Sequence, residues 1–195
     1  MSSILRKPIL VAAALIAVLA LSACGDSHTK VTGGTYAGES GANAPYLDVG
    51  PLVYEVQLSR ELNPVDREDA SYLQGLSPAD AQLEAGQEWF GVFVQVYNHS
   101  EQAHPASTSL TITDTRGNKY PPVSTDQINP FTYRAGTVPA KDQLPPLNTV
   151  AAAGPTQGAL LLYKIKVVSL DNRPLELKIV DPSDPSQSAT AELDV

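Results

Sequence analysis

The sequence predicts an all-β protein that folds as an antiparallel β-sandwich. From Pro45 onward, apolar and polar residues alternate with a period of two in six to eight short segments, which is the pattern of strands buried on one face. Connections rich in proline and glycine separate these segments, and no long stretch repeats with the period of a helix. Many short strands joined in this way are typical of a sandwich, here with long proline-rich loops and at most one short helix.

The strongest predicted strand is Trp89–Tyr97, which has apolar residues on both faces and should therefore lie at the centre of a sheet. Phe90, Val92, Val94 and Val96 line one face, and Trp89, Phe93 and Tyr97 line the other. The remaining predicted strands are Leu52–Leu58, Ser109–Thr113, Lys119-Tyr120 after the turn Asp114–Asn118, Ala159–Val168, Leu175–Ile179 and Ala189–Val195. In the first of these, Leu52, Tyr54, Val56 and Leu58 are expected to share the buried face. The single predicted helix is a turn or two that begins at the N-cap Ser77 and ends at Gly86.

The N-terminus has the pattern of an export signal. Arg6 and Lys7 precede Ile9–Leu21, thirteen residues without a polar side chain. At about 1.5 Å per residue this run is too short for the ~30 Å hydrocarbon core of a membrane, and it suits the core of a signal peptide. Leu21-Ser22-Ala23-Cys24 resembles the lipobox of bacterial lipoproteins, which implies that the Cys24 sulfur receives a diacylglyceryl group, with palmitate among its acyl chains, and that the signal is cleaved just before Cys24. The alternative is an ordinary secretory signal followed by a chance cysteine.

Charge and composition narrow the class of partner. Without Arg6 and Lys7, 11 basic residues remain against 21 acidic ones, so the formal charge changes from −8 to −10. Such an acidic chain is a poor partner for nucleic acid or for anionic lipid headgroups. We expect a signal peptide at residues 1–23, a lipidated cysteine with a flexible, polar tether at 24–44, and one β-sandwich domain at 45–195.

Four segments carry a resemblance to a known family. Glu88–Asn98 is a long apolar strand that ends in Asn, and Ile112–Tyr120 is a strand followed by an acidic turn with Gly and then Tyr. Gly154–Tyr163 places Gly-Pro before a Gly and an apolar strand, and Pro174–Pro182 is a strand that ends in Val-Asp-Pro. Residues 46–195 thereby resemble the uncharacterised immunoglobulin-like domain of actinobacterial and Gram-positive lipoproteins, which is often labelled telomeric repeat-binding factor 2-like. The resemblance implies an immunoglobulin-like sandwich at the cell surface and no catalytic residues.

Catalytic and cofactor-binding patterns are missing from the sequence, so we expect no enzyme, no cofactor and no metal. The histidines are His28, His99 and His104, and the only methionine, Met1, leaves with the signal, so soft copper ligands are lacking. No nucleophile elbow, zinc helix or phosphate loop is present. Asp181–Asp184 lacks the spacing of a calcium loop. The seven acidic residues of Glu61–Glu88 suggest a solvated loop, or alternatively a docking site for a basic partner.

The segment Pro121–Pro155 is the one stretch with functional promise. It contains seven prolines, and loops longer than ~12–15 residues are uncommon unless they are functional or disordered. Phe131, Tyr133 and Arg134 lie inside it and are the candidate partner-binding residues, because Tyr and Arg are enriched at interface hot spots. The alternative is a crossing connection in which Phe131 and Tyr133 simply cover one end of the sandwich.

These observations predict a membrane-anchored lipoprotein on the extracytoplasmic face of the cell membrane. Its expected role is that of a non-catalytic binding module whose partner is another protein of the cell envelope. A carrier of a metal or a small molecule is the alternative, and a hydrolase is a third hypothesis.

Overall fold

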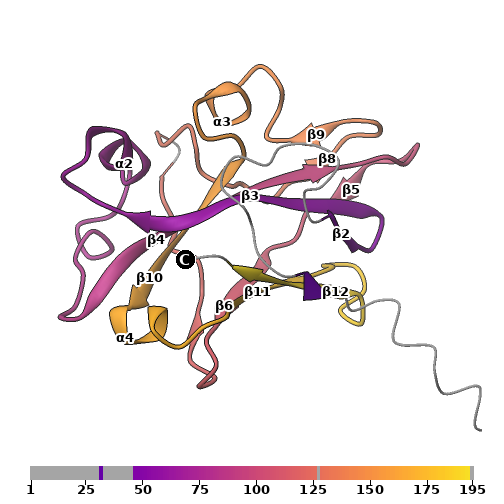
Figure 1. The fold of residues 1–195 in the computed structure, drawn as a ribbon. Helices are drawn as coiled ribbons and strands as arrows, with labels where there is room; N and C mark the ends of the chain where they lie inside the picture. Colours follow the sequence, from indigo (N-terminus) through magenta and orange to yellow (C-terminus); the bar gives the residue numbers. More distant parts are fainter. Residues whose placement is uncertain (1–30, 33–45, 127, 194–195) are drawn as a thin grey trace, which may run out of the picture.

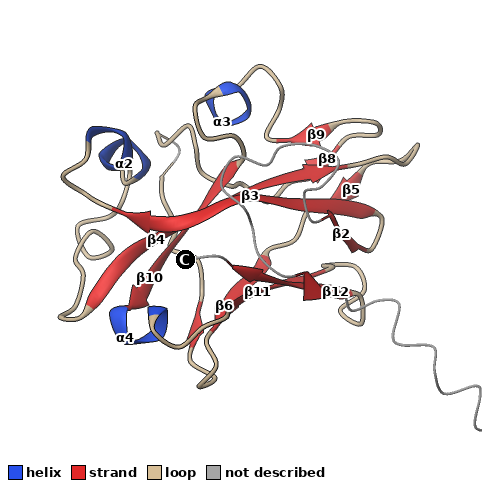
Figure 2. Cartoon of the chain, in the orientation of Figure 1, coloured by secondary structure: helices blue, strands red, loops and turns tan. Residues whose placement is uncertain are grey.

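Two antiparallel β-sheets packed face to face form the frame of the computed structural model, which describes residues 31–32, 46–126 and 128–193 (Figure 1). The elements in chain order are β1 (Val31–Thr32), β2 (Tyr46–Val49), β3 (Leu52–Leu62), α2 (Arg67–Tyr72), β4 (Gln87–Tyr97), β5 (His104–Pro105), β6 (Ser109–Thr113), β7 (Lys119–Tyr120), β8 (Thr137–Val138), β9 (Gln143–Leu144), α3 (Val150–Ala153), β10 (Ala159–Lys166), α4 (Val167–Leu170), β11 (Leu175–Val180) and β12 (Ser188–Leu193). Strands therefore dominate, as the sequence predicts (Figure 2).

One end of each sheet lies next to one end of the other sheet. One sheet has the order β1-β12-β11-β6-β7, and the other has the order β10-β4-β3-β2, with β9 paired to the far end of β4. The pairings between named strands are antiparallel except that of β1 with β12. The hydroxyl of Tyr163 on β10 donates to the carbonyl oxygen of Leu110 on β6 at 3.0 Å. Strand β10, at the end of one sheet, therefore lies against the β6–β7 end of the other.

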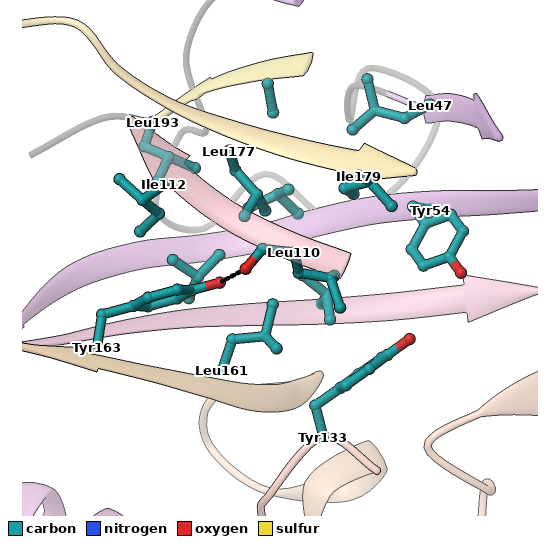
Figure 3. Close-up of a cluster of buried hydrophobic side chains, with 14 of the residues drawn as sticks. Leu47, Tyr54, Leu110, Ile112, Tyr133, Leu161, Tyr163, Leu177, Ile179 and Leu193 are labelled. Atoms are coloured by element: carbon teal, nitrogen blue, oxygen red, sulfur yellow. Dashed lines mark hydrogen bonds between the residues drawn. The ribbon is translucent and has the colours of Figure 1, made fainter. Parts of the chain in front are cut away.

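Strand β4 has buried side chains on both faces, which confirms the prediction of a central strand. Phe90, Val92, Val94 and Val96 are fully buried in the core between the sheets (Figure 3 shows other members of this cluster). Trp89 packs on the outer face, in a second cluster that is covered by α2 and by the segments around it. The members of this second cluster are Leu62, Tyr72, Trp89, Phe93, Leu160 and Leu162.

The turn Asp114–Asn118 joins β6 to β7 as predicted, and its first residue is fixed by four donors. The Asp114 carboxylate accepts from Arg116 N at 3.0 Å, Asn118 N at 2.8 Å, Asn118 Nδ2 at 2.7 Å and Ser169 Oγ at 2.7 Å. Burial by itself would raise the pKa of this carboxyl group, but the hydrogen bonds from Asn118, Ser169 and Arg116 outweigh it and lower the pKa to about 2. Gly117 supplies the positive φ of 83° that the turn requires.

Three local predictions are wrong. A register shift between Val56 and Leu58 turns Leu58 away from the central core and into the second cluster. Strand β10 ends at Lys166, and Val167 begins the short helix α4 instead of continuing the strand. The described part of the chain contains three short helices where at most one was expected. The segment after Ser77, where that helix was expected, forms only a turn, in which the Ser77 hydroxyl accepts from Asp80 N at 3.1 Å.

Helix α2 forms where the sequence gives only a short signal. Asp66 is its N-cap, and its carboxylate accepts from Glu68 N at 2.8 Å and from Asp69 N at 3.2 Å. Glu68 and Asp69 in the first turn are favourably placed at the positive end of the helix. The helix has six residues, which is too few for a repeating apolar stripe to be visible in the sequence.

Strand β1 lies within the range 24–44 that the sequence assigns to a tether. Val31 pairs with Thr190 and Thr32 pairs with Ala191 in parallel register. These two residues therefore pair with a strand of the domain. The predicted signal peptide, Cys24, His28 and the other residues of the tether lie outside the described residues.

Candidate binding pocket beneath the proline-rich loop

The proline-rich segment Pro121–Pro155 extends the sheet along the outer edge of β10. Val123 N donates to the carbonyl oxygen of Leu162 at 2.7 Å. Further along the same edge, Tyr133 N donates to Leu160 O at 2.7 Å, and Leu160 N donates to Phe131 O at 2.7 Å. The segment therefore occupies an edge that would otherwise be open to pairing with another chain.

Tyr133 is an anchor of the core, and it is not the exposed contact residue that the sequence suggests. Its side chain belongs to the central cluster, only 9% of the residue is exposed, and Figure 3 shows the ring pointing inward from the loop. Its hydroxyl donates to Ser107 O at 2.9 Å, while Ser107 N donates to the hydroxyl of Tyr54 at 2.6 Å. Burial, together with the neighbouring Tyr54 hydroxyl, raises the pKa of Tyr133 far above its ordinary value.

Phe131 also packs inward. Its ring meets the ring of Tyr72 edge-on, with 4.8 Å between centroids, and it lies against the second cluster. The two aromatic residues of the loop thus cover the frame, as the alternative interpretation holds. Of the three candidate partner-binding residues, only Arg134 has a side chain that interacts mainly with the loop itself.

Arg134 is held by backbone carbonyl groups and not by an acidic side chain. Its Nη2 donates to Asp126 O and, at 3.2 Å, to Asn129 O. Asn129 in turn is buried, and its Nδ2 donates to Tyr72 O at 2.8 Å and to Gln74 O at 3.0 Å. The guanidinium group is therefore fixed on a loop that is itself tied to the end of α2. Among the residues that the structure describes, no carboxylate forms an ion pair with it.

A pocket of about 310 Å³ opens between the two sheets at this edge. Its floor is formed by Leu110 of β6 and by Leu160–Leu162 of β10, and the loop segments 122–125 and 132–135 form its sides. This volume lies at the lower end of the ~300–1,000 Å³ range of small-molecule sites. The lining residues are Thr108, Leu110, Pro122, Val123, Ser124, Thr125, Thr132, Tyr133, Arg134, Ala135, Leu160, Leu161 and Leu162.

The pocket combines an apolar floor with hydroxyl groups and one cation. Arg134 is the only charged residue in its lining. The hydroxyls of Thr125 and Thr132 are hydrogen-bonded to each other. Those of Thr108 and Ser124 have no hydrogen-bond partner within the described part of the chain, so they remain available to a ligand. Sequence patterns point to the loop and to Arg134 but not to the pocket itself, because its walls come from segments that are far apart along the chain.

The histidines and acidic residues have mainly structural surroundings. His99 stacks on Tyr97 with 6.0 Å between ring centroids, and His104 pairs with Val138 in the short β5–β8 ladder. Over residues 31–32, 46–126 and 128–193, no three His, Cys, Asp or Glu side chains are grouped so that they could hold a metal ion. The carboxylate of Asp181 accepts from Ser183 N at 2.6 Å and from Asp184 N at 3.0 Å, which makes this segment a turn.

Several acidic residues of Glu61–Glu88 are engaged within the fold. Asp66 caps α2, and the carboxylate of Asp69 forms an ion pair with Arg60 and accepts from Asn63 N at 2.8 Å. These contacts give two of the seven acidic side chains a structural role. Asn98, the first residue of a glycosylation motif, is 1% exposed, and its Nδ2 donates to Gln102 O, Val138 O and Pro139 O. The Asn98 side chain therefore joins the segment around Gln102 to the segment 138–139 by hydrogen bonds.

Comparisons with known proteins define the class of fold. No family model matches the chain, and no curated protein matches it, so nothing here supports the telomeric label. Among solved structures, the yjhA protein of Bacillus subtilis is similar with a TM-score of 0.50 and 13% identity, over 81% of this chain and 98% of that one. At this identity the likeness shows the fold alone, and it agrees with the β-sandwich that the sheets described above form.

Two further structures are more distant. The ycdA protein of Bacillus subtilis subsp. subtilis str. 168, described provisionally as a lipoprotein, has a TM-score of 0.47 and 12% identity, over 78% of this chain and 39% of that one. An uncharacterised β-sandwich protein of Clostridium difficile 630 has a TM-score of 0.43 and 14% identity, over 86% of this chain and 97% of that one. Within the described ranges, no helix is long and apolar enough to span a membrane.

Proposed function

We propose that this protein is a lipid-anchored, non-catalytic binding domain on the extracytoplasmic face of the cell membrane, and that it takes a small-molecule ligand in the pocket beneath the proline-rich loop. The observation that carries the proposal is the fixed guanidinium group of Arg134, which lines a cavity without an acidic partner. A preorganised polar group above an apolar floor is the usual composition of a binding site.

The anchor is supported by the lipobox-like residues Leu21–Cys24 after an apolar core. Two or three acyl chains on Cys24 would hold the protein firmly, because each buried CH₂ contributes ~0.8 kcal/mol. We expect the mature protein to begin at Cys24 with covalent lipid and to partition into the detergent phase. The Cys24→Ala variant should be either uncleaved or released, as measured by mass spectrometry and phase partitioning. A variant that remains lipid-modified and bound to cells would contradict the anchor.

Binding is tested by native mass spectrometry of the full chain purified from its own cells. Ala135 is exposed at the rim of the pocket, so Ala135→Trp should fill the cavity without disturbing the core. We expect a ligand-sized adduct on the wild type that is lost in this variant. Lys178→Trp on the exposed face of β11 is the matched control and should retain the adduct. Equal adducts on all three proteins would place binding elsewhere.

A protein of the cell envelope is the second candidate partner. Leu147, in the turn before α3, and Val150, the first residue of α3, are 73% and 51% exposed. Apolar side chains in such positions can form the centre of an interface. Proximity labelling on intact cells should then lose a specific partner in the Leu147→Ser, Val150→Ser variant but not in Ala135→Trp.

A further inference from the structure

We infer that the pocket selects a small organic carboxylate with a short apolar body. The inference rests on the proposed function and adds the chemical class of the ligand. Three features of the site lead to it: the sign of its charge, the unused donors of Arg134, and the composition of its floor.

The charge of the site is opposite to that of the chain. The whole sequence has a formal charge of −8, yet the pocket lining contains one cation and no acidic residue. The groups that accept hydrogen bonds from Arg134 are uncharged carbonyl oxygens, and in the described part of the chain no carboxylate forms an ion pair with it. In a cavity partly shielded from water such a cation favours an anion and disfavours an ammonium group.

The donors of Arg134 are only partly used. The Nη2 atom makes both of the hydrogen bonds to Asp126 O and Asn129 O. The N–H groups on Nε and Nη1 have no acceptor in the part of the chain that the structure describes. A carboxylate is an acceptor-only group, and charge-assisted hydrogen bonds to guanidinium are about twice as strong as neutral ones. The hydroxyls of Thr108 and Ser124 offer further donors.

The apolar residues of the pocket indicate the chemistry of the part of the ligand beyond its carboxylate. Leu110 and Leu160–Leu162 line the cavity and are almost fully buried, and the half-buried Pro122 and Val123 add apolar surface to its wall. An inorganic anion would leave this surface uncovered, whereas a short aliphatic or branched chain removes it from water at about 25 cal/mol per Å². The volume of about 310 Å³ suits a small ligand.

The test uses hexanoate, 1-hexanol and hexylammonium as probes of one size and different charge. The full-length lipidated protein is held in phospholipid nanodiscs, with empty nanodiscs as a blank, and leucine methyl groups are followed by NMR. We expect hexanoate to shift the methyl signals of Leu110 and Leu160–Leu162 saturably, with a Kd of about 1 mM or tighter. Hexylammonium should not shift them.

Substitutions assign the selectivity to one side chain. Arg134→Gln should weaken hexanoate binding about tenfold or more, while 1-hexanol binding stays unchanged. Arg134→Lys keeps the charge and should bind hexanoate with an affinity between those of the wild type and the Gln variant. Arg116→Gln removes the same charge from an exposed turn and is the matched control. Wild-type methyl signals outside the pocket report that each variant is folded, and if Arg134→Gln does not fold, the comparison of Arg134→Lys with the wild type decides.

The outcomes separate this inference from the proposed function. If 1-hexanol and hexanoate bind equally and Arg134→Gln changes neither, the pocket binds ligands but does not select carboxylates, and the inference is overturned alone. Preferential binding of hexylammonium overturns it as well. If none of the three probes shifts these methyl signals at about 10 mM, the pocket is not a ligand site, and the proposed function falls with the inference.

Discussion

Replacing Tyr133 by alanine tests whether the proline-rich loop is anchored in the core. The residue is 9% exposed, so nearly the whole side chain would be lost from a packed site. An aromatic side chain buries about 150–250 Å², which at about 25 cal/mol per Å² corresponds to about 4–6 kcal/mol. Measured truncations of large aromatic residues cost about 3–5 kcal/mol. We therefore expect Tyr133→Ala to lower the free energy of unfolding by about 3–5 kcal/mol.

The hydroxyl group can be separated from the ring. Tyr133→Phe removes the donor to Ser107 O at 2.9 Å and leaves that carbonyl group short of a partner, which should cost about 1–3 kcal/mol. Arg134→Gln, a change at the adjacent residue, is the control. It loses two hydrogen bonds at the surface of the loop and should cost about 1 kcal/mol or less.

Urea denaturation of the full chain, followed by the fluorescence of Trp89, the only tryptophan, measures all three variants. The ranking Tyr133→Ala, then Tyr133→Phe, then Arg134→Gln is expected. A Tyr133→Ala variant within about 0.5 kcal/mol of the wild type would refute the reasoning, because changes of that size are typical of surface positions. It would also restore Tyr133 as a candidate contact residue.

Three further predictions concern the frame. Val94→Ala should lower the free energy of unfolding by about 2 kcal/mol, since Val94 is fully buried, and no change in urea denaturation would mean that β4 is not central. Gly50→Ala, at a φ of +59°, would bring the added Cβ into collision with Oδ2 of Asp181, whereas at Gly117, φ +83°, nothing lies within 4 Å of the added Cβ. Gly50→Ala should therefore lower the melting temperature more than Gly117→Ala. Both positions carry the backbone penalty of ~1–2 kcal/mol, so equal thermal shifts would contradict the steric contact at Gly50. The pKa of Asp114 is lowered to about 2 in the folded protein, whereas an Asp in the unfolded chain has a pKa of about 4. The ionised carboxylate of Asp114 should therefore stabilise the fold fully above about pH 4, and this contribution should be lost as the pH falls toward 2. The difference in unfolding free energy between wild type and Asp114→Asn should therefore shrink over that interval, and a constant difference would exclude this linkage.

The regular strands could be predicted because their side chains follow a period of two. Ile112, Leu177 and Ile179 alternate with polar residues and are fully buried, so the pattern and the structure agree there. The prediction for Leu58 is wrong because a β-bulge inserts a residue into the strand and reverses which side chains face the core beyond it. The sequence alone does not mark the position of that bulge. The prediction for Val167 is wrong because an apolar residue directly after a strand fits the pattern of that strand, although Val167 is 40% exposed.

The candidate site could be predicted only in part. Proline content and length drew attention to Pro121–Pro155, and Arg134 does line the pocket. The direction in which Phe131 and Tyr133 point depends on which edge the loop follows, which is a property of the sheet order. The hydroxyl at Thr108 joins the site only because β10 meets the β6–β7 end of the other sheet. Such a meeting is tertiary information that no local pattern contains.

The pairing of β1 with β12 limits how the domain can be oriented above a bilayer. Val31 follows Cys24 by seven positions along the chain, and seven extended residue steps reach at most about 25 Å. If Cys24 is acylated, the membrane lies close to the β12 edge, and a fluorophore at Ser186 should be quenched by lipid-bound quenchers more than one at Ser124. The opposite result would contradict the orientation. Because β1 and the β6–β7 pair are at opposite ends of one sheet, the pocket would face the surrounding water. Its ligand would then arrive by diffusion from outside the cell membrane and not from within the lipid.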